Sequence, residues 1–224
     1  MNTLEHMERK ISEWGASFHG YSNVGAKLSE DLKALPYAIT IGVRLSGFII
    51  GQIEDKPTFT YFHHYRSVNA LIDQITLKAL LLIEQNGYRA FAVPASQTVN
   101  DMEDKYSGVF PHKTAAVMAG LGWVGKNGLF ISKDYGPRVR LGTILTDMEL
   151  PAENKIIASK CGECKICIQS CPAMALTGNC WNEGCDRSSV LDAKACSDYM
   201  NAKFKHIGRG SVCGICVKVC PYGR

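Results

Sequence analysis

The placement of cysteine constrains this chain more than any other feature of its sequence. All ten cysteines lie between Cys161 and Cys220, and the first 160 of the 224 residues contain none. Disulfide-rich secreted domains are usually shorter and carry cysteine throughout, so this clustering favours metal ligation, with disulfide bonding as the alternative. The asymmetry predicts a boundary near Pro151, with one domain over residues 1–150 and another over 151–224.

The first cysteine motif is Cys161-x2-Cys164-x2-Cys167-x3-Cys171-Pro172. This spacing is typical of bacterial ferredoxins, in which three closely spaced thiolates wrap one 4Fe-4S cluster and the fourth cysteine ligates the other cluster. Zinc is the competing metal, but a tetrahedral site built from two separated cysteine pairs would leave Cys167 without a role. The motif therefore predicts a domain with two 4Fe-4S clusters.

A second motif, Cys213-x2-Cys216-x3-Cys220-Pro221, repeats the last three cysteines of the first, with Gly210 at the place of the missing one. The crossover rule assigns one cluster to Cys161, Cys164, Cys167 and Cys220. The other cluster takes Cys171, Cys213, Cys216 and one remote cysteine, for which the candidates are Cys180, Cys185 and Cys196. Because the two ligand sets interleave, we expect folding of this region to depend on its metal.

Net charge follows the same division of the chain. Residues 1–150 carry 15 Lys or Arg and 15 Asp or Glu, whereas residues 151–224 carry 10 and 6, so the formal charge of +4 lies in the cysteine-rich part. A basic surface could suggest nucleic acid, but an oxidised cluster with its four thiolates carries about two negative charges. We interpret the basic excess as compensation for the charge of two clusters.

The first 150 residues alternate between helical and strand-like patterns. Helices are predicted over residues 3–14, 68–85 and 114–119, and strands over 37–45, 88–93, 128–132 and 138–146. This succession indicates an α/β or α+β fold, with one sheet covered by helices, ahead of a ferredoxin-like domain. The chain has neither a run of about 18 apolar residues nor a start typical of a signal peptide, so we expect a soluble, cytoplasmic protein without membrane contact.

Three further segments carry a family resemblance. Residues 119–127 (AGLGWVGKN), 141–147 (LGTILTD) and 191–196 (LDAKAC), together with the cysteine motifs, resemble epoxyqueuosine reductases over about residues 113–221. In that family the cysteine after the Leu-Asp-Ala segment supplies the remote ligand, which implies Cys196. Cys180 and Cys185 would then be spare thiols that pack near the clusters or in the core.

This family, with the related reductive dehalogenases, implies a cobalamin bound by the N-terminal domain. The clusters would deliver electrons to it while a nearby acid gives the substrate a proton. The resemblance thus predicts a cobalamin-dependent oxidoreductase that receives electrons from a ferredoxin or flavodoxin-like partner. The alternative is an electron-transfer or activator protein that reduces a partner, for example a corrinoid protein, and has no substrate of its own.

The sequence departs from the family pattern at two places. The family's proton-donating aspartate lies in a segment that reads Tyr106-Ser-Gly-Val109 here, so Tyr106 and His112 become candidate catalytic acids, with Asp104 as a third. A solvated loop with a capping or core histidine is the structural alternative. The sequence also ends at Arg224, without the helical-repeat extension with which longer members hold transfer RNA, which makes transfer RNA a doubtful partner.

The glycine-rich run at Gly120–Gly125 fits G-x-G-x-x-G, but it follows a predicted helix, and Asn127 stands where a P-loop needs Ser or Thr. We therefore expect neither a dinucleotide nor ATP there. Close backbone approach to the corrin face is the functional hypothesis, and a purely structural turn is its alternative. The candidate cofactor-binding residues are Gly122, Trp123, Gly125, Lys126 and Asn127.

The adjacent pair His63-His64 lies in an aromatic segment that precedes the predicted helix. As neighbours on a strand they would point to opposite faces, so they would not readily share a metal. We expect a structural role, or contact with the edge of a corrinoid.

Overall fold

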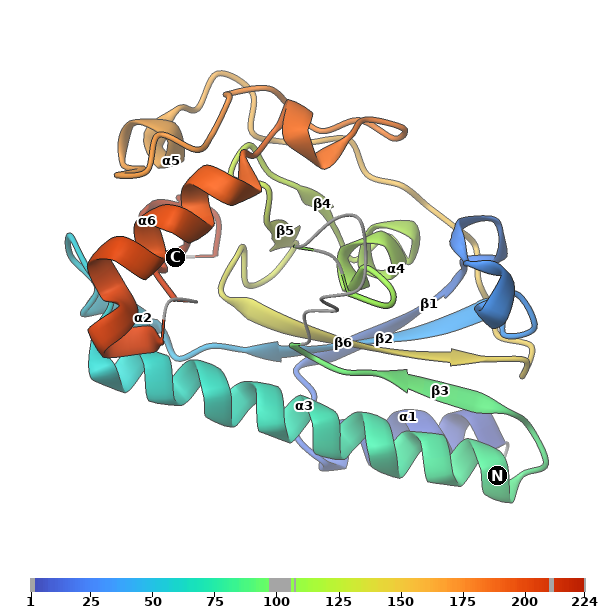
Figure 1. Ribbon diagram of the computed structural model, residues 1–224. Coiled ribbons are helices and arrows are strands. Elements are labelled where there is room, and N and C mark those ends of the chain that lie inside the picture. Colours follow the sequence, from blue (N-terminus) through green and yellow to red (C-terminus); the bar gives the residue numbers. More distant parts are fainter. Residues whose placement is uncertain (1–2, 97–105, 107, 210–211, 224) are drawn as a thin grey trace. The chain divides into compact units, whose positions relative to one another are not determined.

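The computed structural model describes residues 3–96, 106, 108–209 and 212–223, and it divides into two compact units (Figure 1). Unit 1 combines Met1–Arg44, Val68–Leu121 and Arg140–Ile156. Unit 2 combines Leu45–Ser67, Gly122–Val139 and Ile157–Arg224. The cysteine-rich segment therefore packs with two cysteine-free segments that precede Pro151 in the sequence.

Unit 1 is built on a four-stranded sheet in the order β1-β2-β6-β3. These strands are β1 (Phe18–Asn23), β2 (Tyr37–Arg44), β3 (Ala90–Val93) and β6 (Val139–Thr146). β1 pairs with β2 and β3 pairs with β6, both antiparallel. The central strands β2 and β6 are buried along almost their whole length. Strands buried on both faces require covering elements on both sides of the sheet.

Helices supply that cover. One face of the sheet carries α1 (Thr3–Glu13) and the second half of α3 (Phe59–Gln85), whereas α4 (His112–Met118) lies on the other (Figure 1). Two short 3-10 turns, η1 (Gly25–Lys27) and η2 (Glu30–Leu32), lie on the α4 side, where Val24 and Leu28 at the ends of η1 and Leu32 of η2 join the core. Helices that cover a sheet with antiparallel strand pairs make this unit an α+β sandwich, as the sequence predicts.

The elements of unit 1 match the predicted ranges within a few residues, with two exceptions. Helix α3 begins at Phe59, nine residues before the predicted start at Val68. The hydroxyl oxygen of Thr58 accepts a hydrogen bond from the backbone N–H of Tyr61 at 3.0 Å, which caps the helix at this earlier point. Strand β1 was not predicted, because Phe18–Asn23 is mostly polar and forms the edge of the sheet.

Unit 2 consists mainly of short elements joined by loops. They are α2 (Gly47–Gly51), the first turns of α3, β4 (Gly122–Val124), β5 (Phe130–Ser132), α5 (Ile166–Gln169), η3 (Arg187–Ser189), α6 (Ala193–Gly208) and α7 (Ile215–Val219). β4 and β5 form an antiparallel hairpin in which Trp123 lies opposite Ile131. Helices α5 and α7 contact each other, and α2 contacts α7. The N-terminus of α6 is capped by Asp192, whose carboxylate accepts from the N–H of Ala195 at 2.9 Å.

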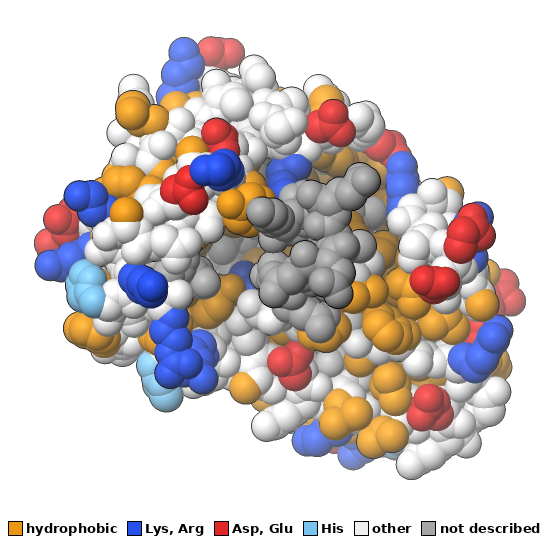
Figure 2. Space-filling model, viewed as in Figure 1, with side chains coloured by type: hydrophobic (Ala, Val, Ile, Leu, Met, Phe, Trp, Pro, Cys, Tyr) orange, Lys and Arg blue, Asp and Glu red, His pale blue; other side chains and the backbone are white. Residues whose placement is uncertain are grey.

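Within the part of the chain that the structure describes, no helix is both long and apolar enough to cross a membrane. On the face drawn in Figure 2, acidic and basic side chains are mixed.

Candidate metal centre

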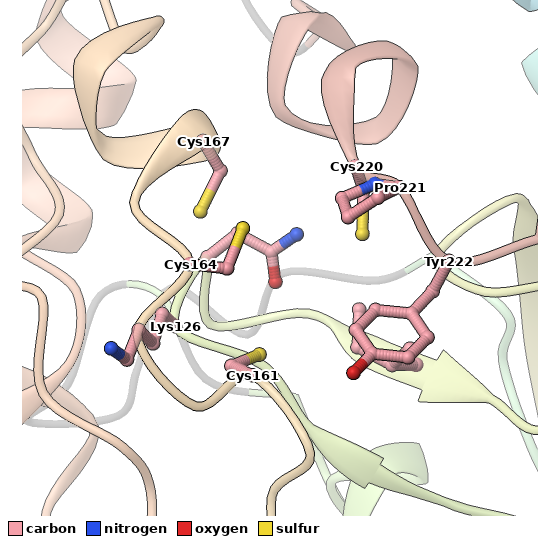
Figure 3. A pocket seen from close by; sticks show the side chains of 9 residues that line it. Lys126, Cys161, Cys164, Cys167, Cys220, Pro221 and Tyr222 are labelled. Carbon is pink, nitrogen blue, oxygen red and sulfur yellow. The ribbon is translucent and has the colours of Figure 1, made fainter.

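Four cysteines from two distant parts of the sequence line one pocket in unit 2. Cys161, Cys164 and Cys167 come from the loop before α5 and from its first turn, and Cys220 follows the end of α7. Their sulfur atoms point toward a common space (Figure 3). The pocket has an empty volume of about 320 Å³, including the part that is open to solvent, and its lining is largely apolar.

The local backbone explains how three of these thiols reach one space. The N–H of Cys164 donates to the carbonyl of Cys161 at 2.9 Å, which closes a tight turn. Gly162 lies inside that turn with φ of +46°, a conformation that glycine adopts without steric cost. Helix α5 then begins at Ile166, so Cys167 lies in its first turn. The C-x2-C-x2-C spacing thus folds as one loop around the pocket.

Cys220 completes this group from the other end of the domain. Its backbone leaves the helical conformation at the end of α7, and Pro221 and Tyr222 continue the lining of the pocket. The hydroxyl of Tyr222 donates to the backbone carbonyl of Lys160, and its ring meets that of Trp123 edge-on with centroids 5.0 Å apart. These contacts hold the chain just before Cys161 and connect it to the β4–β5 hairpin.

A second group of thiols gathers Cys171, Cys196, Cys213 and Cys216. The pKa of Cys196 is raised to about 11, mainly by burial and then by the neighbouring Cys213 and Cys171. The pKa of Cys216 is also raised mainly by burial, followed by Cys213, Cys196 and Cys171, and least by Cys167 of the first group. Such mutual effects require close sulfur atoms. The structure thereby brings Cys196 to the two-cysteine end of the second motif.

The first group contains the four cysteines that the crossover rule assigns to one cluster, and the second contains Cys196, the remote ligand that the family resemblance implies. The donor set of the first is four soft thiolates around an apolar space, which suits a 4Fe-4S cluster, because four cysteines are the usual ligands of such a cluster. Among the described residues, no three His, Cys, Asp or Glu side chains are gathered so that they could hold a single metal ion. Gly210, at the place of the missing cysteine, lies outside the described residues.

The two remaining cysteines lie in the loop between α5 and α6. Cys180 is partly buried, and Cys185 is exposed. Exposure of Cys185 corrects the expectation that both spare thiols are packed. The N–H of Cys185 donates to the carbonyl of Asn182 at 3.1 Å, so this thiol sits on a surface turn.

The glycine-rich run is not a free loop, because Gly122–Val124 forms strand β4 of the hairpin. A Cβ atom at Gly122 would lie 2.0 Å from the backbone oxygen of Ile131, and one at Gly125 would lie 2.8 Å from the side-chain oxygen of Asn127. Close approach within the hairpin therefore explains both glycines. This supports the structural alternative for the glycines themselves.

Lys126 and Asn127 lie beside the first cysteine group. Both are buried and both line its pocket, and Lys126 Nζ donates to the carbonyl oxygen of Gly162 at 2.6 Å. Trp123 is also buried and packs against Cys220. Three of the five residues predicted to contact a corrin thus lie beside the first cysteine group, and contact with a corrin stays a prediction.

The histidine pair at His63-His64 lies in the first turns of α3, so the prediction of a strand there is wrong. His63 is exposed, and His64 Nε2 accepts a hydrogen bond from the backbone N–H of Ser46 at 2.9 Å. Burial lowers the pKa of His64, with a smaller effect from His63. This contact ties the start of α2 to α3 and supports the structural role.

The candidate catalytic acids lie in unit 1. His112 Nε2 donates to the carbonyl of Pro94 at 3.0 Å, and its Nδ1 is 2.9 Å from the hydroxyl of Thr143. Burial lowers the pKa of His112 to about 4, so the ring is neutral at pH 7 and its Nδ1 accepts from Thr143. Tyr106 is 39% exposed, and Asp104 lies outside the described residues. A catalytic role for Tyr106 or His112 stays a prediction.

Comparison with known proteins adds to this geometry. Residues 160–223 match the family model of a 4Fe-4S double cluster binding domain. The epoxyqueuosine reductase of Pseudomonas aeruginosa is 34% identical over 247 aligned positions, which cover 98% of this chain and 62% of that protein. The chain is a relative of the epoxyqueuosine reductases. The enzyme of Aliivibrio fischeri is 30% identical over 152 positions, which cover 63% of this chain and 35% of that protein.

Solved structures show the same fold. A catabolic reductive dehalogenase superposes with a TM-score of 0.76 at 20% identity over 98% of this chain and 32% of its own. The epoxyqueuosine reductase of Streptococcus thermophilus gives 0.64 at 20% identity, over 100% of this chain and 67% of its own. This chain spans about a third to three fifths of the length of the two curated relatives. The resemblance seen in the sequence and the expected fold are thereby confirmed, as is a double 4Fe-4S domain.

Proposed function

We propose that this chain is an iron–sulfur oxidoreductase whose two clusters pass electrons to a bound cobalamin that reduces a substrate. The observation that carries the proposal is the arrangement of eight cysteines in two groups of four, each drawing ligands from both motifs. Interleaved ligands hold two clusters close together, as electron transfer between them requires. The relationship to named reductases supplies the reaction class.

Cobalamin enters the proposal through a reductive dehalogenase of solved structure, for which a mechanism of B12-dependent dehalogenation is suggested. When bound, a corrinoid supplies a cobalt centre that takes up electrons at low potential. In this chain, Cys161, Cys164, Cys167 and Cys220 would hold one cluster, and Cys171, Cys196, Cys213 and Cys216 the other. A ferredoxin or flavodoxin-like protein is the proposed source of electrons.

The substrate is a separate part of the proposal. One solved relative is an epoxyqueuosine reductase with an epoxyqueuosine-modified transfer RNA stem loop. Tyr106 occupies the place of the family's acid here, and we propose a different substrate class for this chain. A salt-dependent gel shift with such a stem loop would contradict this part and restore transfer RNA as a partner.

Cobalamin binding tests the enzyme proposal directly. We expect the anaerobically reconstituted protein to bind added cobalamin with a change in its absorption spectrum, and to keep it through gel filtration. Apoprotein stripped of iron is the control, because loss of the clusters should block electron delivery without removing the N-terminal unit. Absence of cobalamin binding to the iron-loaded protein would remove the enzyme proposal.

The second candidate function is an electron-transfer or activator protein without its own substrate. Tyr106, which is 39% exposed, stands where the family has an aspartate, and this departure favours the second candidate. Iron-loaded protein should then reduce a separate corrinoid protein and show no turnover alone. Turnover of a small electrophile by the cobalamin-loaded chain would exclude this candidate.

A further inference from the structure

The structure assigns Lys126 and Asn127 a role at the first cluster: we propose that they raise the reduction potential of the cluster held by Cys161, Cys164, Cys167 and Cys220. This inference rests on the double 4Fe-4S domain and not on cobalamin or on any substrate. It is separate from the corrin-contacting role that the sequence predicts for these two residues.

Burial of a lysine beside the loop that carries the first cysteines is the first observation. Lys126 is only 8% exposed, it lines the cysteine pocket, and its Nζ donates to Gly162 O at 2.6 Å. A charged lysine is rarely buried without a compensating charge. A cluster with its thiolates supplies negative charge and gains more when it is reduced, so a buried cation beside it stabilises the reduced form.

The hydrogen bond to Gly162 has a second consequence. In a trans peptide the C=O and the following N–H point in opposite directions. Lys126 holds the carbonyl of Gly162, and Figure 3 shows its side chain beside the loop that carries Cys161 and Cys164. The N–H of Glu163 therefore points away from Lys126, and a donor that reaches a cluster sulfur from this loop would raise the potential.

Asn127 contributes from the same segment. It is 4% exposed and lines the pocket, and its side-chain oxygen accepts from the N–H of Leu129 at 3.1 Å. With the oxygen engaged in the hairpin, the amide NH2 group is the part left to face the pocket. An amide donor within an apolar lining strengthens the field that Lys126 creates, because the local dielectric constant is low.

Lys165 provides a matched control. It follows Cys164 directly and carries the same charge as Lys126, but it is exposed, so water and salt screen it from the cluster. Removal of each lysine changes the formal charge by one unit at the same cysteine loop. Burial is the property that distinguishes them.

The experiment is an EPR-monitored redox titration of reconstituted protein without cobalamin. Lys126→Gln keeps a donor for Gly162 O but no charge. We expect the reduction potential of its first cluster to fall by about 59 mV or more, which is a tenfold loss of preference for the reduced state in a one-electron step. Asn127→Leu should shift it in the same direction. Lys165→Gln and the second cluster should stay at the wild-type potential.

The proposal is overturned if fully iron-loaded Lys126→Gln titrates like Lys165→Gln. Iron loss in Lys126→Gln with Lys126→Arg fully loaded would support the proposal, because these two variants differ in charge. Iron loss in both Lys126 variants would show that Lys126 is a structural contact, and would overturn the proposal. The redox titration needs no cobalamin, so it can be made on a protein that binds none. The proposed function and this inference therefore fail separately.

Discussion

Acidification should destabilise unit 1 through His112. The ring is neutral, with Nε2–H donated to Pro94 and Nδ1 accepting from Thr143, and burial lowers its pKa from 6.5 to about 4. The unfolded chain therefore takes up a proton before the folded chain does, and stability is lost as the pH falls through 6.5 toward 4. The full loss is about 3 kcal/mol, of which about 1.3 kcal/mol should be reached between pH 7.5 and 5.5.

Hydrogen exchange of the β6 amides measures this loss within unit 1. Opening free energies at pH 7.5 and 5.5, corrected for the intrinsic exchange rate, are compared between wild type and His112→Gln. Glutamine can donate to the Pro94 carbonyl but does not titrate, so the difference between the proteins cancels all other titrating groups. Parallel changes in the two proteins would show that His112 has an ordinary pKa, and would reopen its role as a catalytic acid.

Three further predictions concern unit 2. Cys196→Ser should lower the iron content from about eight atoms per chain to about four or fewer, whereas Cys185→Ser should keep all of the iron. Equal iron contents of the two variants in a colorimetric assay would contradict the ligand set. Gly122→Ala should lower the free energy of unfolding by about 2 kcal/mol or more, because its Cβ would lie 2.0 Å from Ile131 O. Gly51→Ala is the control, because a Cβ there meets no atom within 4 Å. Similar thermal unfolding of both variants would refute this prediction. Removal of iron should abolish amide protection in α5 and α7 while β6 in unit 1 stays protected, and uniform loss or uniform retention in exchange measurements would disprove the separation.

The cysteine spacing was informative because a cluster imposes its own geometry on the chain. Two thiol groups could be predicted from spacing alone, apart from one remote ligand. Cys196 lies in the first turns of α6, and nothing in its spacing from Cys171 or Cys213 distinguishes it from Cys180. Only the family resemblance favoured it, because long-range packing, which spacing does not report, brings α6 to Cys213.

Other features depended on local signals that the periodicity of apolar residues does not carry. The early start of α3 follows from the Thr58 cap, which precedes an aromatic and polar stretch without a helical apolar pattern. Gly122 could be taken for a cofactor contact, since a glycine that accommodates a ligand and one that accommodates a neighbouring strand look alike in sequence. The Ile131 carbonyl on the opposite strand of the hairpin decides between the two, and only the folded chain brings it to Gly122.

The position of Cys220 also fixes when iron can be installed. It closes a pocket whose other three thiols lie 53 to 59 residues earlier in the chain. A ribosome that has made the first motif has therefore produced three sulfur atoms without their fourth, and the same holds for Cys171 until the second motif appears. Metal delivery has to wait until Cys220 has been synthesised, which makes maturation of this domain an all-or-nothing event for whatever machinery loads it.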